Sequence, residues 1–291
     1  MKHCQNNNTT DWVENMERFW IVTNDGKDKD RSMTGRVIGL LEQRGKVCVL
    51  CHKDKQNNII KDKIPENIDC AIVIGGDGSL IEVARVLQPG IPILGVNMGT
   101  LGYLTEVEVD DLEEAMEQII NEDYTTEERM MLQGTFENGN TSIALNDIVL
   151  TRKGHLRILH FNLYVNGELL NSYEADGMII STPTGSTAYN LSAGGPIVEP
   201  TASSIVVTPI CSHSLNTRSI VLSAEDEIII EIGKRRHDQV EEVFIAFDGA
   251  DTVEMKTGEK IAICKSEKKT TMMHLSRVSF MERLRRKMKG N

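Results

Sequence analysis

The first part of the chain alternates short apolar runs with segments of helical periodicity. Two of the runs, Ala71–Ile74 and Ile91–Val96, are continuous in hydrophobic residues, which is typical of strands buried on both faces of a parallel sheet. The alternation of strand and helix predicts βαβ units. The predicted strands are Phe19–Thr23, Val47–Cys51, Ala71–Ile74 and Ile91–Val96, and the predicted helices are Met33–Arg44, Leu80–Leu87 and Asp110–Asn121.

After Thr126 the pattern changes to short strands, with Asn-Gly pairs at 138–139 and 166–167 that indicate hairpins. The predicted strands are Met131–Phe136, Ile143–Thr151, His160–Val165, Glu168–Leu170, Ile205–Thr208, Glu227–Ile232 and Val243–Phe247. We therefore expect an α/β N-terminal domain with a parallel sheet, residues 1–126, and an all-β, sandwich-like C-terminal domain, residues 127–275. The segment Ser276–Lys289 predicts a basic helix that docks by its apolar face, with solvated charges outside.

Composition narrows the class of protein. Hydrophobic residues make up 40% and charged residues 26% of the 291 positions, as in an ordinary globular protein. No apolar run approaches the roughly 20 residues of a membrane helix, and the polar start lacks a signal peptide, so we expect a cytoplasmic location. Lys and Arg number 32 against 43 Asp and Glu, and the net charge of −11 argues against nucleic acid or an anionic membrane as partner. The six cysteines show no framework of paired spacings. Cys48 and Cys51 have C-x-x-C spacing, but they lie in an apolar predicted strand and no second ligand pair follows, which argues against zinc.

A glycine-rich turn, GGDGS at residues 75–79, follows the predicted strand Ala71–Ile74. Such a turn offers backbone N–H groups and the positive end of a helix dipole to an anion. It is neither a Walker A loop, because no Lys-Ser/Thr pair follows, nor a dinucleotide fingerprint, because Ile81 stands at the third glycine position. Asp77 repels an anion, so we expect it to hold a metal ion or to take a proton from the group that attacks phosphorus. The alternative is a tight turn in which Asp77 only caps the helix.

A second glycine cluster, GVNMGTLGYL at residues 95–104, follows the next predicted strand. Because α/β folds place their ligands at the carboxyl ends of the strands, we expect the two glycine loops to be neighbours. Tyr103 either stacks on a flat ring of the ligand or fills the core beneath the loop.

The most unusual segment lies in the β-rich half and reads DGMIISTPTGSTAYNLSAGGP, residues 176–196. Its hydroxyl groups could each satisfy local backbone only, but the length of the run favours a site for a ligand with phosphate, sugar and ring parts. Asp176, at its start, could accept a hydrogen bond from a sugar or amide donor. The pair Asn146-Asp147 follows Ile143–Leu145 and adds a polar step where an apolar run would normally end in a turn.

These segments together resemble the NAD kinases. GGDGS alone is shared with phosphofructokinases and with diacylglycerol and sphingosine kinases. NMGTLGY, LND and the hydroxyl-rich segment are together much more specific. The resemblance runs from about Phe19 to Lys289. It implies transfer of the γ-phosphoryl of ATP, or of a unit of polyphosphate, to the adenosine-ribose 2′-hydroxyl of NAD. It also implies that the C-terminal segment, residues 276–291, returns to the first domain and that the chains form a homodimer or homotetramer.

The resemblance further implies roles for individual residues. Asp77 matches the base toward the 2′-hydroxyl, with Gly78 beside it against the substrate, and Asn146 and Asp147 match a pair on the NAD ribose. Mg²⁺ or another divalent metal is implied by ATP chemistry, although no metal-ligand cluster is visible in the sequence. The other predicted substrate contacts are Tyr103, Arg157, Asp176, Thr184, Thr187, Ala188, Tyr189, Asn190, Leu191 and Ser192.

Some positions depart from the family pattern. Ser79 replaces the commoner Thr, Tyr103 the commoner Phe, and Ser212 stands where many members have Pro. Glu82 and Glu174 stand where other members often carry Arg, which leaves the choice of phosphoryl donor and the tolerance of NADH open.

Three other functions compete with this interpretation. A lipid kinase would share the GGDG turn, but no amphipathic segment with exposed aromatic residues is present to meet a membrane. A non-catalytic NAD sensor would gain nothing from a carboxylate among phosphate-binding N–H groups. A nicotinamide-dependent oxidoreductase would need the missing G-x-G-x-x-G pattern.

Overall fold

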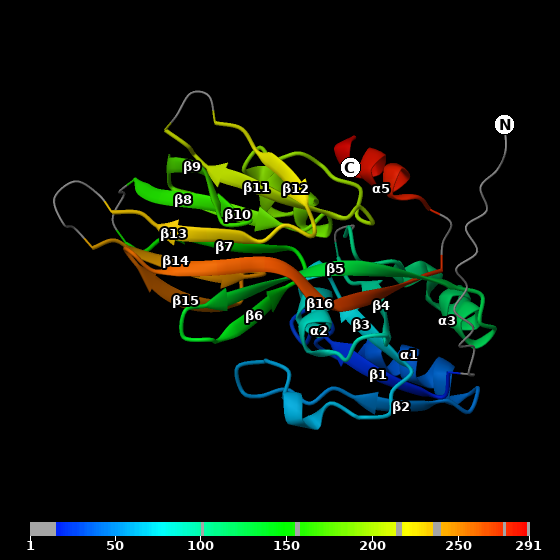
Figure 1. The fold of residues 1–291 in the computed structure, drawn as a ribbon. Helices are drawn as coiled ribbons and strands as arrows, with labels where there is room; N and C mark the ends of the chain where they lie inside the picture. Colours follow the sequence, from blue (N-terminus) through cyan, green and yellow to red (C-terminus); the bar gives the residue numbers. More distant parts are fainter. Residues whose placement is uncertain are drawn as a thin grey trace, which may run out of the picture.

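The structure is a computed structural model that describes residues 16–99, 102–154, 158–213, 217–234, 240–275 and 278–289. The first part of the chain forms the alternating strands and helices at the lower right of Figure 1. These elements are β1 (Arg18–Thr23), α1 (Ser32–Glu42), β2 (Val47–Leu50), β3 (Cys70–Gly75), α2 (Asp77–Val86), β4 (Pro92–Asn97) and α3 (Leu112–Ile120).

The second part is built almost entirely of strands. They are β5 (Thr125–Phe136), β6 (Thr141–Ala144), β7 (Asp147–Arg152), β8 (Leu159–Val165), β9 (Glu168–Ala175), β10 (Gly177–Ser181), β11 (Ser204–Ile210), β12 (Ile220–Ser223), β13 (Ile228–Ile232), β14 (Glu242–Phe247), β15 (Asp251–Lys256) and β16 (Lys260–His274). A 3-10 turn (Thr184–Thr187) and the short helix α4 (Tyr189–Ser192) lie between β10 and β11, and α5 (Phe280–Met288) follows β16.

The first half is a three-layer α/β unit, as the sequence predicted. Its strands run parallel in the order β2-β1-β3-β4. Successive side chains of a strand point to opposite faces, so Phe19 and Ile21 pack with α1 and α3, while Trp20 and Val22 pack with α2. Helices therefore cover both faces of the sheet, and its carboxyl edge is the place left for a ligand.

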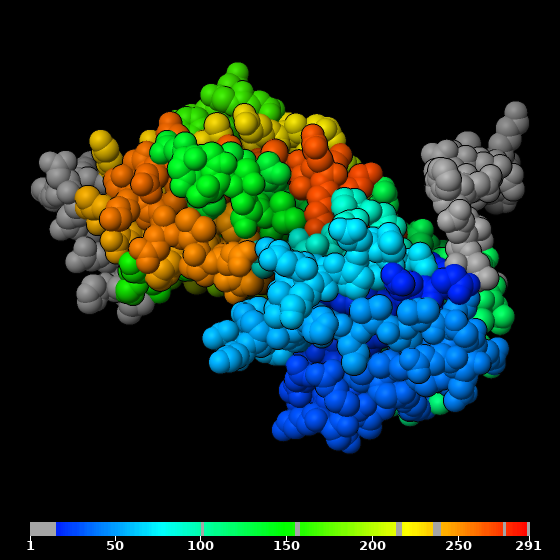
Figure 2. Space-filling model, turned by 90° about the horizontal axis from the view of Figure 1, so that it is seen from below, coloured from blue at the N-terminus to red at the C-terminus, as the bar shows by residue number. Residues whose placement is uncertain are grey.

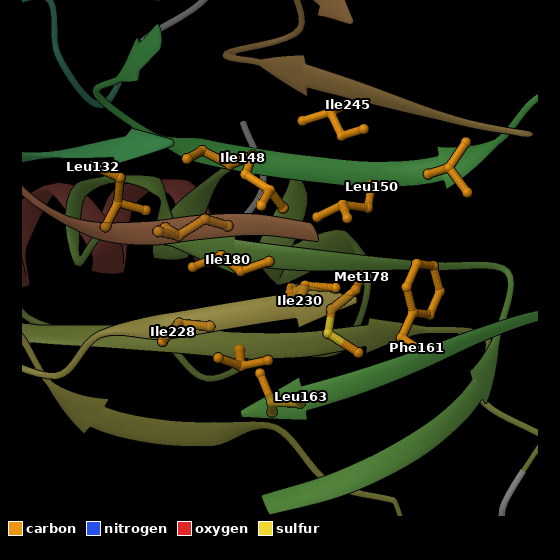
Figure 3. Close-up of a cluster of buried hydrophobic side chains, with 14 of the residues drawn as sticks. Leu132, Ile148, Leu150, Phe161, Leu163, Met178, Ile180, Ile228, Ile230 and Ile245 are labelled. Carbon is orange, nitrogen blue, oxygen red and sulfur yellow. The ribbon is translucent and has the colours of Figure 1, made fainter. Parts of the chain in front are cut away.

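The second half is a β-sandwich, which confirms the predicted fold class. The smaller sheet is antiparallel, in the order β12-β11-β10-β7-β14-β15, and packs on strands of the larger sheet. Figure 3 shows the core between them, with Ile148 and Ile180 from the smaller sheet and Phe161 and Ile230 from the larger one. All four side chains are fully buried.

The strand β16 joins the two halves into one continuous sheet. It pairs antiparallel with β13, where Ile263 lies opposite Ile228, and parallel with β4, where Thr271 lies opposite Pro92. In Figure 1 it crosses the middle of the molecule beside β5, and Figure 2 shows the first half packed against the sandwich. The sequence analysis did not predict this strand. The boundary between residues 126 and 127 stays a prediction, and β5 begins close to it, at Thr125.

Two predicted elements differ from the structure. The run Ile143–Thr151 is two strands, β6 and β7, because the chain turns at Leu145-Asn146. The C-terminal helix does not dock by a buried apolar face, since none of its residues is buried and Met288 is 73% exposed. Polar contacts with the first half hold it instead. Arg283 pairs with Glu106, and the Lys287 Nζ lies 4.2 Å from the ring centroid of Tyr103.

Within the described residues, no helix is long and apolar enough to cross a membrane.

Phe161 should be among the side chains on which the sandwich most depends. We expect Phe161→Ala to lower the free energy of unfolding by about 3–5 kcal/mol, because it removes a fully buried ring and leaves a cavity. Leu170→Ala on the outer strand β9, where the side chain is 48% exposed, is the control and should change stability by less than about 0.5 kcal/mol. Urea denaturation measures both. Equal losses in the two variants would contradict this assignment of the core.

Candidate active site

Asp77 stands at the carboxyl edge of the parallel sheet, as the first residue of α2. The strand before it, β3, lies between β1 and β4, so the turns after all three strands meet here. The Asn24 amide group, after β1, donates to the Ser79 hydroxyl at 3.0 Å, and the Met98 N–H, after β4, donates to the Gly75 carbonyl at 2.6 Å. These bonds fix the glycine turn between its two neighbours.

The Asp77 carboxylate is held by the second glycine loop. Its Oδ2 accepts a hydrogen bond from the Tyr103 N–H at 2.8 Å, and its Oδ1 accepts from Leu104 and Thr105 at 3.1 and 3.3 Å. A Cβ on Gly102 would lie 2.1 Å from Oδ1, so only glycine allows this close approach. The prediction that the two glycine loops are neighbours is confirmed for the described residues, which exclude Thr100 and Leu101.

The simple capping role for Asp77 is not what the structure shows. The residue at the N-cap position of α2 is Gly76, and no side chain caps this helix. Asp77 directs its carboxylate to the N–H groups of the next loop and not to those of its own helix.

Lys27 brings a positive charge to the same edge. Its Nζ lies 2.8 Å from where a Cβ on Gly76 would stand and 3.2 Å from where a Cβ on Gly99 would stand. The two glycines thus leave room for the ammonium group between the two turns. Lys27 was not predicted from the sequence, because an exposed lysine in a polar loop carries no signal of its own.

Asn146 and Asp147 lie where β6 gives way to β7, and Asp248 holds them there. The Asp248 carboxylate accepts hydrogen bonds from the N–H groups of Leu145, Asn146 and Asp147 at 2.8, 2.7 and 3.2 Å. Burial and the nearby Asp248 raise the pKa of Asp147 to about 7. Burial also raises the pKa of Asp248, although the three N–H donors and Arg85 act in the opposite direction. Sequence reasoning missed Asp248, for which the only signal was Asp-Gly after a predicted strand.

The hydroxyl-rich segment packs on this turn. The Thr182 hydroxyl donates to the Leu145 carbonyl at 2.6 Å, and a Cβ on Gly185 would lie 2.1 Å from the Asn146 carbonyl oxygen. Part of the segment is therefore structural, as the alternative interpretation of its hydroxyl groups allowed. Asn190 belongs to this part, because its buried side-chain amide group donates to the carbonyls of Ser186 and Pro196.

Two cavities border the segment, and together they are lined by half of the predicted site residues. One, of about 250 Å³, lies between Tyr103 and the pair Thr184 and Thr187, and the buried Thr184 hydroxyl has no hydrogen-bond partner among the described residues. The other, of about 390 Å³, is lined by Asn146, Asp147, Val149, Ala188, Tyr189, Ala246, Asp248 and Gly249. Tyr189 and Leu191 are 47% and 39% exposed and Ser192 is exposed, so these three remain free to meet a ligand.

Asp176 is not brought into this group. Asp176 accepts a hydrogen bond from Arg152 at 2.6 Å, just before β10 begins. In the pairing of β10 with β7, Gly177 lies opposite Thr151 and Ser181 opposite Asp147. The length of that strand, roughly 14 Å, separates Asp176 from Asp147, so only an extended ligand would touch both. Arg157 lies outside the described residues.

The described residues do not form a protein-held metal site. None of them belongs to a group of three or more His, Cys, Asp or Glu side chains that could bind a metal ion. Asp77 uses both carboxylate oxygens to hold backbone N–H groups. Among the described residues, Asp77 is therefore not part of a cluster that could hold a metal ion.

The combination of sheet edge, glycine turns and cavities defines a class of protein. A glycine-rich turn with the Lys27 ammonium group beside it, next to a sandwich loop rich in hydroxyl groups, is suited to a ligand with phosphate, sugar and ring parts, which is typical of nucleotide-binding enzymes. Comparison with known proteins identifies the family within this class.

The chain belongs to the ATP-NAD kinase family. The ATP-NAD kinase N-terminal domain matches residues 7–124 and the C-terminal domain matches residues 145–275. An NAD kinase of Lachnospira eligens is 45% identical, over 94% of this chain and 100% of that protein. An NAD kinase of Agathobacter rectalis is 44% identical, over 95% of this chain and 99% of that protein.

Solved structures share the fold at lower identity. The crystal structure of yeast NADH kinase complexed with NADH has a TM-score of 0.84 at 23% identity and covers 96% of this chain and 89% of the yeast chain. The crystal structure of an NAD kinase from Archaeoglobus fulgidus in complex with ATP has a TM-score of 0.74 at 23% identity, covering 94% of this chain and 97% of that one.

The raised pKa of Asp147 predicts a pH-dependent stability. An Asp whose pKa rises on folding contributes stability that is complete below its unfolded value of 3.8 and is lost as the pH rises to about 7. Asn cannot ionise, so Asp147→Asn should gain on the order of 2 kcal/mol relative to wild type between about pH 5 and pH 8. Urea denaturation at the two pH values measures this gain.

The exposed Asp30, whose pKa lies below its usual value, provides the matched control. Asp30→Asn should show the same difference from wild type at both pH values. A difference for Asp147→Asn that does not change with pH would contradict the assignment of this titration to Asp147.

Proposed function

We propose that this protein is an NAD kinase that transfers the γ-phosphoryl of ATP, or a unit of polyphosphate, to the 2′-hydroxyl of the adenosine ribose of NAD. The observation that carries the proposal is the carboxylate of Asp77, fixed by three backbone N–H groups at the edge of the sheet in a chain that belongs to the ATP-NAD kinase family.

Asp77 is the general base of this reaction. A carboxylate has about four lone-pair positions, and the three N–H groups occupy two at Oδ1 and one at Oδ2. Oδ2 thus keeps a lone pair for the 2′-hydroxyl. As the hydroxyl oxygen attacks the γ-phosphorus, its proton passes to Oδ2, the bond between the γ-phosphorus and the bridging oxygen breaks, and ADP leaves.

The acceptor dinucleotide lies along the sandwich face of the site. Asn146 and Asp147 bind its ribose from the cavity that they line, and Gly78 lies against it beside the base. The residues that contact its two halves are Tyr103, Thr184, Thr187, Ala188, Tyr189, Asn190, Leu191 and Ser192. Asn190 acts chiefly by shaping the loop, since its side chain is turned inward. Asp176 contacts the dinucleotide beyond these cavities, and Arg157 is a further contact that the resemblance to the family implies.

The divalent metal enters as part of the substrate. Mg²⁺ neutralises charge on the transferred phosphoryl group and arrives bound to the ATP phosphates. The ammonium group of Lys27, between the glycine turns, adds a fixed positive charge next to them. The homodimer or homotetramer and the cytoplasmic location stay predictions from the sequence.

The activity is tested directly with the purified protein. Wild type incubated with NAD, ATP and Mg²⁺ should form NADP, which an NADP-specific dehydrogenase detects. Asp77→Asn should lower kcat by roughly a hundredfold or more, as expected for removal of a positioned general base. NAD binding, measured by calorimetry, should remain.

Asp69→Asn is the matched control, because Asp69 also accepts two backbone N–H bonds in the same half but lies away from the site. It should keep wild-type turnover. A loss below about tenfold in Asp77→Asn would mean that Asp77 only holds its loop. A wild type that binds NAD but makes no NADP from ATP or polyphosphate would favour the sensor alternative.

The metal ion should act in complex with ATP. We expect EDTA to abolish NADP formation and the rate to follow the concentration of the Mg²⁺–ATP complex rather than that of free Mg²⁺, because the described residues offer no metal cluster. Initial rates with ATP and Mg²⁺ varied independently measure this. Tight binding of Mg²⁺ to the protein alone would contradict it.

A further inference from the structure

Asp248, the residue after β14, is bonded to three consecutive residues that connect β6 to β7, the last of which is the first residue of β7. Besides the three N–H bonds to its carboxylate, its own N–H donates to the Asp147 carbonyl at 3.0 Å. The Asp248 side chain is 1% exposed, and its backbone is in the left-handed region with φ of 52°. A residue held by three bonds to its buried carboxylate and a fourth from its own N–H is a rigid support and not a mobile ligand.

This support decides where Asn146 and Asp147 point. Three successive N–H groups converge on one carboxylate only if the chain leaves the extended conformation, since successive N–H groups of a strand point in opposite directions. The apolar run Ile143–Thr151 would otherwise continue as one strand. Asp248 therefore sets the turn that presents both side chains to the cavity of about 390 Å³, which Asp248 also lines.

Arg85 connects the same turn to the helix of Asp77. It lies in the last turn of α2, the ten-residue helix that begins at Asp77. Its Nε is 3.9 Å from the Asp248 Oδ2 and donates to the Ile143 carbonyl at 3.3 Å, and its Nη2 pairs with Asp251. The Arg85 side chain is only 12% exposed. One arginine thus joins a helix of the first half to the hairpins of the sandwich.

We propose that Asp248 is a positioning residue of the acceptor site and that Arg85 fixes this site relative to the base at the other end of α2. The inference rests on the proposed function, because it assigns the NAD ribose to Asn146 and Asp147. Neither Asp248 nor Arg85 touches the reacting atoms. They set the distance between the acceptor and Asp77, to which an in-line transfer is sensitive.

The carboxyl groups of Asp147 and Asp248 give a pH dependence that can be measured and that a purely structural role of Asp248 would not produce. Asp147 faces Asp248, and the charged groups around the pair are Arg85 from α2 and Asp251 from β15. The negative charge of Asp248 favours the protonated form of Asp147, so KM for NAD should change with an inflection near neutral pH. Removing that charge should move the inflection to lower pH.

The test compares Asp248→Asn with Asp251→Asn, a matched control in which Arg85 loses an acidic partner that is 60% exposed. Asp248→Asn should raise KM for NAD by about tenfold or more, leave KM for ATP within about twofold, and shift the inflection of KM for NAD to lower pH. Asp251→Asn should leave all three close to wild type. Equal rises in both KM values, or an unchanged pH profile, would overturn the positioning role of Asp248.

Arg85→Met tests whether Arg85 fixes the acceptor site relative to Asp77, and it keeps the proposal falsifiable if Asp248→Asn does not fold. Met preserves much of the buried stem but loses the guanidinium contacts. We expect kcat to fall by about tenfold with a smaller change in KM for NAD, because acceptor and base are misaligned. An unchanged kcat would overturn the role of Arg85.

Calorimetry separates this inference from the proposed function. If wild type binds NAD and makes no NADP, the kinase assignment fails. Weaker NAD binding by Asp248→Asn, with ATP binding unchanged, would then still support the positioning role. Unchanged NAD binding in that variant would overturn it.

Discussion

The backbone hydrogen bonds of β16 are the constraint on which the two-part architecture depends. At one end the strand completes the sandwich beside β13, and at the other it continues the parallel sheet beside β4. A shift of register between Lys265 and Lys269 lets it bend from one half into the other. Because the sheet is continuous, the glycine turns of the first half and the cavities of the sandwich have a fixed relation, and α2 and the β6–β7 turn can meet across it through Arg85.

Both polar centres of the site use the same physical device. Asp77 and Asp248 each accept hydrogen bonds from the N–H groups of three consecutive residues, and each joins segments that are far apart in the sequence. A carboxylate makes strong hydrogen bonds to backbone N–H groups, so it can hold a loop without regular secondary structure. The two centres differ in whether their carboxylate can still accept a hydrogen bond from a ligand. Asp77 keeps a lone pair for a ligand, whereas Asp248 is enclosed beside a second carboxyl group.

The sequence correctly predicted those elements that a local pattern of hydrophobic residues determines. The strands β3 and β4 were found because both are continuous apolar runs, and their pairing makes neighbours of the two glycine loops. The strand β16 was not found, because its lysines and threonines interrupt the alternation and a bulge changes its phase. Asp248 and Arg85 could not be assigned either. Leu145, a partner of Asp248, lies 103 residues from it in the sequence, and Ile143, a partner of Arg85, lies 58 residues from it. No periodicity links positions so distant.

The position of β16 along the chain also governs how the protein is made. It is the last strand in the described part of the chain, so the ribosome delivers it after every other strand of the sheet. Until it emerges, β4 and β13 each lack the partner that covers one of their edges, and an uncovered edge is a template for pairing with other chains. Folding of the sheet is therefore completed only after β16 has been synthesised, by contacts of long sequence separation that form slowly. The nascent chain is most exposed to aggregation in the interval before residues 260–274 leave the ribosome.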